Sequence, residues 1–303
     1  MSSVDGVIIA TVALFAIALL AAIVFYVLGL CMVLRGNGLG WTNILGITLV
    51  LFCLLNVLTT SIQLAQEYLP YSYDDDELVR ATTYGSMVAS FLTYVFEILL
   101  FCAIVCSSAK FGSKSGHGGK GLRIYAFVFT GILLVLALAN FGLGVSLAVK
   151  IEQNRNVRNR LSSAAAISIT RMSIARVRLN FSLLVLTLAA AVSAAGTGIG
   201  LLAKRIAHKS IAVLLFVSSV LLVTAAATNL GISVSQVDPV RGYRLRYSAT
   251  PIEVLIFLSM IFGTWTLVAG YATYVMACRA ASRFSRGHVS DGVGTIHKTS
   301  QYA

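Results

Sequence analysis

The stretch that decides the fold is residues 84–109, which read YGSMVASFLTYVFEILLFCAIVCSSA. At about 1.5 Å of rise per helical residue, it is long enough to cross the roughly 30 Å hydrocarbon core of a bilayer. Its polar side chains recur at helical spacing, so they share one face: Ser90, Thr93, Tyr94 and Glu97. Lipid accepts such a face only at a cost in free energy, and we therefore expect it to point into a bundle of helices.

Six further stretches have similar length and apolar character, namely residues 7–34, 41–64, 124–149, 179–203, 210–234 and 252–278. The whole chain is 58% hydrophobic and 11% charged, with a mean hydropathy of +0.88, which excludes a water-soluble domain. The sequence predicts an all-α integral membrane protein: a seven-transmembrane-helix bundle in residues 1–278, followed by a disordered cytosolic tail in residues 279–303.

Orientation in the membrane depends on the residues around the first span. The 23 Lys and Arg residues divide almost evenly between the two sides, so their number does not decide. The first span, which usually dominates, has Asp5 before it and Arg35 after it. We expect the N-terminus outside and the C-terminus in the cytosol. We expect the protein in the plasma membrane rather than in an endomembrane.

The net charge of +12 does not indicate a nucleic-acid partner, because the basic residues lie beside the spans, where membrane proteins normally carry them. The bilayer is the expected partner. Residues 150–178 combine arginines with an apolar middle, which predicts an interfacial helix or an N-terminal extension of the fifth span, with its arginines at phospholipid headgroups. The basic inner loops are a candidate surface for a cytosolic signalling partner.

Polar residues inside the spans form the candidate site. Glu97 is the only acid deep within a span. A functional interpretation is that it binds a cationic group or relays protons. The structural alternative is a neutral carboxyl that hydrogen-bonds within the bundle. With polar residues from other spans it predicts an outward-facing pocket with Glu97 at its floor. The alternative is that these residues only join helices, at about 0.6 kcal/mol per contact. The candidate ligand-binding residues are Asn56, Thr60, Gln63, Thr93, Tyr94, Glu97, Asn140 and Asn229.

Small residues indicate where helices pack closely. Glycine has no side chain and lets two helix backbones approach each other. The fifth and seventh spans contain such residues, and we expect close helix contacts at Gly196, Gly198, Gly200, Gly263 and Gly270.

Several chemistries lack the residues that they need. No lysine lies within a predicted span, which excludes a retinal Schiff base. The four histidines lie in predicted loops and the tail, so we expect no metal site with histidine ligands inside the spans. No Ser–His or Cys–His pairing suggests a hydrolase, and we expect neither enzymatic activity nor a cofactor.

Together these patterns favour a receptor-like sensor of an extracellular small molecule, which would bind in the outward-facing polar pocket. Two alternatives stay open: a transporter or channel-like protein with Glu97 as its coupling site, and a structural membrane scaffold without a ligand. The identity of the ligand does not follow from the sequence.

Overall fold

The computed structural model describes residues 3–34, 41–68, 75–113, 119–156, 163–203, 209–236 and 261–282, with side chains over most of these ranges, and all of them are helical. Each of the seven helices is long and apolar enough to cross a membrane. The prediction of an all-α chain with seven helices able to span a membrane is therefore confirmed for the described residues. Residues 279–282 of the predicted tail belong to the last helix, and the rest of the tail, residues 283–303, lies outside the described residues.

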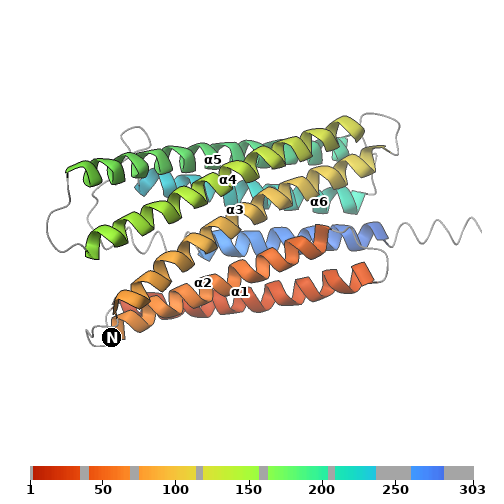
Figure 1. Cartoon of the computed structure of the whole chain (residues 1–303). Helices are drawn as coiled ribbons and strands as arrows, with labels where there is room; N and C mark the ends of the chain where they lie inside the picture. Colours follow the sequence, from red (N-terminus) through yellow and green to blue (C-terminus); the bar gives the residue numbers. More distant parts are fainter. Residues whose placement is uncertain are drawn as a thin grey trace, which may run out of the picture.

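The helices alternate in direction along the chain (Figure 1). The chain therefore begins at one end of the bundle, here called the N-terminal end, and leaves it at the other, the C-terminal end. The helices are α1 (Ser3–Leu34), α2 (Trp41–Tyr68), α3 (Asp75–Ser113), α4 (Gly119–Asn156), α5 (Ser163–Ala203), α6 (Lys209–Gln236) and the C-terminal helix (Ile261–Ser282).

The helices extend beyond the apolar stretches that predicted them. The 41 residues of α5 rise about 61 Å, twice the thickness of the hydrocarbon core. Because α5 begins at Ser163, the basic segment before residue 179 continues the fifth span as an N-terminal extension, one of the two predicted alternatives. Similarly, α3 begins at Asp75, before the apolar stretch that starts at residue 84.

The central helix is α3, which crosses between two groups of helices: α1, α2 and the C-terminal helix on one side, and α4, α5 and α6 on the other (Figure 1). It contacts α2, α4, α5 and α6. Its middle is completely buried over Phe96, Leu100 and Ile104. Side chains placed in the middle of α3 are therefore shielded from lipid by helices on several sides.

The C-terminal helix is held by polar contacts from its fully buried tyrosines. Tyr271 Oη donates to the Thr42 carbonyl of α2 at 2.8 Å, and Tyr274 Oη lies 3.1 Å from Ser107 Oγ of α3. Ser218 Oγ of α6 donates to the Gly270 carbonyl at 2.8 Å. The C-terminal helix thus packs between α2, α3 and α6 and completes the bundle.

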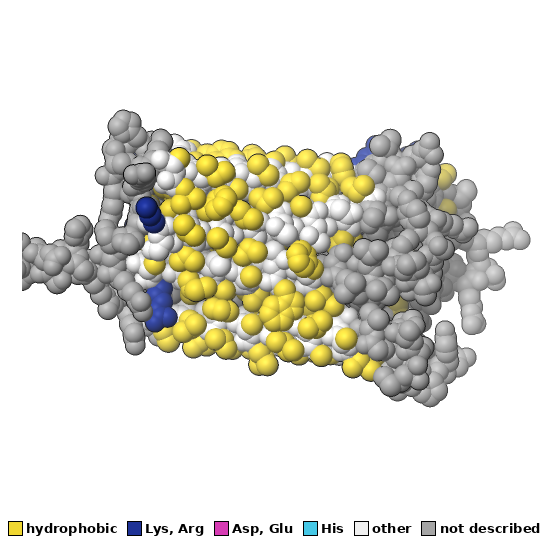
Figure 2. Space-filling view, turned by 180° about the vertical axis from the view of Figure 1, so that it is seen from behind, with side chains coloured by type: hydrophobic (Ala, Val, Ile, Leu, Met, Phe, Trp, Pro, Cys, Tyr) yellow, Lys and Arg dark blue, Asp and Glu magenta, His cyan; other side chains and the backbone are white. Residues whose placement is uncertain are grey.

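The surface between the two ends of the bundle is apolar. Exposed side chains there include Leu20, Ile124 and Val135, which are 63%, 64% and 65% exposed. In Figure 2 the described Lys and Arg side chains lie towards the two ends, and the face between them shows hydrophobic and uncharged side chains. Such a surface suits lipid contact.

Candidate functional site in the polar interior

Glu97 is completely buried in the middle of α3. At 1.5 Å per residue it lies about 20 Å from Lys110 and about 25 Å from Arg80 along this helix. Its Oε1 accepts a hydrogen bond of 2.7 Å from Asn229 Nδ2 of α6, whereas its Oε2 has no hydrogen-bond partner among the described residues. The structure thus brings together two of the predicted site residues, 132 positions apart, and leaves one carboxyl oxygen available.

A second polar group centres on Asn180 of α5. Its Oδ1 accepts hydrogen bonds from Tyr94 Oη of α3, at 2.8 Å, and from Asn140 Nδ2 of α4, at 3.0 Å. One amide oxygen therefore joins three helices, and it links two more of the predicted residues. Tyr94 precedes Glu97 by one helical turn on the same face of α3, so the two polar groups are adjacent.

Asn180 is not among the residues that the sequence predicted for the site. Asn180 starts an Asn-Phe-Ser sequon, but its amide oxygen accepts the two hydrogen bonds inside the bundle. The signal that could have identified it is its position one turn after Arg176 at the edge of the fifth span. A polar side chain there is placed to meet polar groups on neighbouring helices.

A crevice opens beside this group between α3, α4 and α5. It encloses about 20 Å³, enough for one water molecule and far below the few hundred Å³ of a small-molecule pocket. We call it the Arg176 crevice; it is lined by Met87, Ser90, Phe91, Tyr94, Ala137, Asn140, Phe141 and Arg176. Only two of its lining residues, Tyr94 and Asn140, belong to the eight predicted site residues.

Arg176 is the charged residue of the crevice. Its guanidinium is partly buried and lies beside Gly144 of α4, where an added Cβ would come within 3.1 Å of Cζ. Asn140, one turn before Gly144, is buried, and its Oδ1 has no hydrogen-bond partner among the described residues. The crevice therefore contains both an arginine and an amide oxygen that can accept a hydrogen bond.

The remaining predicted residues do not join this network. Three of them hydrogen-bond to carbonyl groups of their own helices: Asn56 to Phe52, Thr60 to Asn56 and Thr93 to Ala89, at 3.1, 2.7 and 3.0 Å. Gln63 is partly exposed. Such intrahelical hydrogen bonds satisfy a polar side chain without another helix. Ligand binding by these residues stays a prediction.

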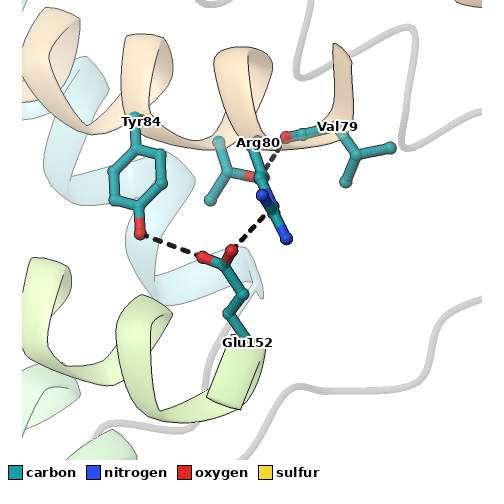
Figure 3. Close-up of polar contacts among 5 residues, drawn as sticks. Val79, Arg80, Tyr84 and Glu152 are labelled. Carbon is teal, nitrogen blue, oxygen red and sulfur yellow. Dashed lines mark hydrogen bonds and ion pairs between the residues drawn. The ribbon is translucent and has the colours of Figure 1, made fainter. Parts of the chain in front are cut away.

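An ion pair joins α3 and α4 nearer the N-terminal end. Arg80 Nε lies 2.7 Å from Glu152 Oε1, and Tyr84 Oη makes a long contact of 3.4 Å with Glu152 Oε2 (Figure 3). Both charged side chains are partly exposed, at 45% and 31%. Such pairs contribute little to stability, but this one occupies the only acidic side chain described on α4.

No protein-family model, curated protein or solved structure matches this chain. Among the described residues, no group of three or more His, Cys, Asp or Glu side chains is arranged to hold a metal ion.

Proposed function

We propose that this seven-helix membrane protein is a receptor-like sensor of an extracellular small molecule. In this proposal a polar group of the ligand enters the Arg176 crevice. The observation that carries the proposal is that two polar groups lie one helical turn apart on α3. The Asn140–Asn180–Tyr94 group borders the crevice, and the Glu97–Asn229 pair lies further in, so that together they involve α4, α5, α3 and α6.

The proposed coupling works through hydrogen bonds that a ligand can replace. A group that offers a hydrogen to Asn140 Oδ1, or that competes for the hydroxyl of Tyr94, changes how these side chains meet Asn180. Tyr94 and Glu97 lie on one turn of α3, so a shift of that turn reaches the bond to Asn229 of α6. A sensor needs two distinct sites and two states that bind the ligand differently, and this path offers a physical connection between them.

The part of α3 directly beyond Glu97 is apolar, which favours a sensor over a permeation path. Beyond Glu97 towards the C-terminal end, α3 buries Leu100, Phe101 and Ile104 completely. The crevice contains room for one water-sized group, so a ligand would insert a terminal group and leave the rest of the molecule outside.

The proposed orientation places the N-terminal end, with the crevice side of α5, outside the cell. Asp5 before the first span and Arg35 after it support this orientation. The C-terminal end, with its basic loops, then faces the cytosol and is the proposed contact surface for a signalling partner. We propose the plasma membrane as the location, because an extracellular ligand is sensed there.

The test measures whether ligand binding near the N-terminal end changes the distance between helices at the C-terminal end. Spin labels at Lys120 of α4 and Lys209 of α6, both exposed, report their separation at the C-terminal end, in a protein with exposed Cys31 replaced by serine. Compounds that raise the melting temperature are then added. We expect such a compound to change the distance between the labels, and Tyr94→Phe to reduce the change. Stabilising compounds that never alter this distance would count against a sensor.

A second candidate function is transport of protons or a small cation, with Glu97 as the coupling carboxyl. The specific observation in its favour is the buried Oε2 without a partner among the described residues. Reconstituted protein should then produce a flux that depends on a pH or cation gradient and that disappears in Glu97→Gln. A scaffold, in contrast, would show neither flux nor a ligand-dependent distance.

A further inference from the structure

We infer that the Arg176 crevice binds an anionic oxygen group, a phosphate or a carboxylate. This inference rests on the proposal that the crevice is where a ligand enters, and it specifies the chemistry of the group that enters. Arg176 is the only charged residue among the eight that line the crevice. Its guanidinium presents donors and no acceptor, so it requires an acceptor.

The acidic side chains described nearby have other partners. Glu152, two turns beyond Gly144 on α4, pairs with Arg80 at 2.7 Å. Glu97 lies one turn further along α3 than Tyr94 and accepts its hydrogen bond from Asn229 of α6. Among the described residues Arg176 has no counter-charge, which is unfavourable for a partly buried cation, and an anion from outside the chain would offset that cost.

The shape of the crevice suits a planar cation that faces an anion. Gly144 leaves space for the guanidinium against the backbone of α4, where a Cβ would crowd it. A guanidinium can form two parallel hydrogen bonds with a phosphate or carboxylate, and an ammonium group cannot match this geometry. The crevice therefore favours an oxygen anion over a neutral polar group.

Asn140 provides a second requirement. Its buried Oδ1 is an acceptor without a partner among the described residues, so a bound group must bring a hydrogen to it. A hydrogen-bearing phosphate oxygen meets that need directly. A carboxylate has no such hydrogen, and it meets the need only if a water molecule fills the crevice and the carboxylate stays at its mouth beside Arg176.

Two sources can supply the same anionic group. Arg176 lies two residues before Arg178, at the edge of the apolar part of α5, which is the level at which phospholipid headgroups meet a protein. A soluble ligand with a phosphate or carboxylate would reach the same position from the aqueous side. The test therefore needs one arm for each source.

The experiment uses the full chain in nanodiscs of neutral phosphatidylcholine. In one arm, inorganic phosphate or acetate is titrated; in the other, phosphatidic acid is added to the bilayer. The readouts are the melting temperature and the number of bound lipids in native mass spectrometry. We expect saturable binding in at least one arm, weakened about tenfold or more by Arg176→Gln. Arg176→Lys keeps the positive charge and should lose part of this affinity.

The matched control is Arg171→Gln, an exposed arginine on the same helix, which should leave the binding unchanged. Equal losses in the Arg171 and Arg176 variants would overturn the site in favour of diffuse attraction, and so would absence of saturable binding in both arms. Binding that depends on Arg176 but leaves the spin-label distance unchanged would support the anion site and contradict the sensor. A distance change that is insensitive to Arg176→Gln would support the sensor and contradict the anion.

Discussion

Asn229 of α6 donates a 2.7 Å hydrogen bond to the completely buried carboxyl of Glu97 in α3. This bond fixes the rotation of α6 against the central helix, because both side chains must face the same point. Only one of the two carboxyl oxygens is used among the described residues. The pair therefore serves packing through Oε1, while Oε2 is available for a proton, a water molecule or a cation.

Substitutions of Glu97 separate these roles. Glu97→Gln keeps the size of the side chain and an acceptor for Asn229, so we expect a melting temperature close to that of the wild type. Glu97→Leu leaves the Asn229 amide unpaired and should lower the free energy of unfolding by about 1–3 kcal/mol.

The same variants test function. If Glu97 couples transport, the Gln variant loses flux while it remains folded. Full activity of a well-folded Glu97→Gln protein, in liposome flux or in the spin-label assay, would restrict Glu97 to packing.

The Asn180 amide should contribute more to the free energy of unfolding than either of the two hydrogen bonds that it accepts contributes alone. Asn180→Leu removes the acceptor of both Tyr94 and Asn140 and should cost about 1–3 kcal/mol, whereas Tyr94→Phe removes one bond and should cost about 0.6 kcal/mol. Thermal unfolding of both variants and of the double variant measures the coupling. Losses that simply add would contradict a shared acceptor.

The helices were predictable from the sequence because hydropathy alone requires them in a bilayer, but their lengths were not. The start of α5 at Ser163 lies well before the apolar stretch, since the arginines around Arg171 to Arg178 do not interrupt a helix. The hydrogen-bond partners of the polar residues could not be predicted from the sequence either. Periodicity shows which face of α3 carries Glu97, but not that Asn229, 132 residues later, faces it.

The predicted glycine contacts show the same limit. Gly198 lies against Phe216 of α6, and Gly270 lies near Leu100 of α3, as expected for close packing. At Gly196 and Gly200, however, an added Cβ would meet no described atom within 4 Å, so the prediction was wrong there for the part of the chain that the structure describes. Small residues at these positions permit a close contact, but the rotation of the helix decides which of them makes it.

Gly46 of α2 should be intolerant of a side chain. A Cβ there would overlap the ring of Tyr26 and the hydroxyl of Tyr271, which is held by its bond to the Thr42 carbonyl. We expect Gly46→Ala to lower the free energy of unfolding by about 1–3 kcal/mol. The control is Gly131→Ala in α4. A Cβ there meets no atom of the described residues within 4 Å, and because alanine has a higher helix propensity the change should be neutral or stabilising. Equal melting temperatures of the two variants would contradict the packing around Gly46.

The direction in which the Arg176 crevice faces decides which molecules can reach it. Asp5 and Arg35 predict that the N-terminal end lies outside the cell. An epitope tag after Ser2 should then react with impermeant antibody on intact cells, while a tag after Ala303 should react only after the membrane is permeabilised. A cytosolic marker protein controls for leaky cells.

Because seven spans put the two tags on opposite sides, the reverse labelling pattern would be equally clear. It would expose the crevice side to the cytosol, and the ligand of a sensor would then have to be a cytosolic anion or an inner-leaflet lipid.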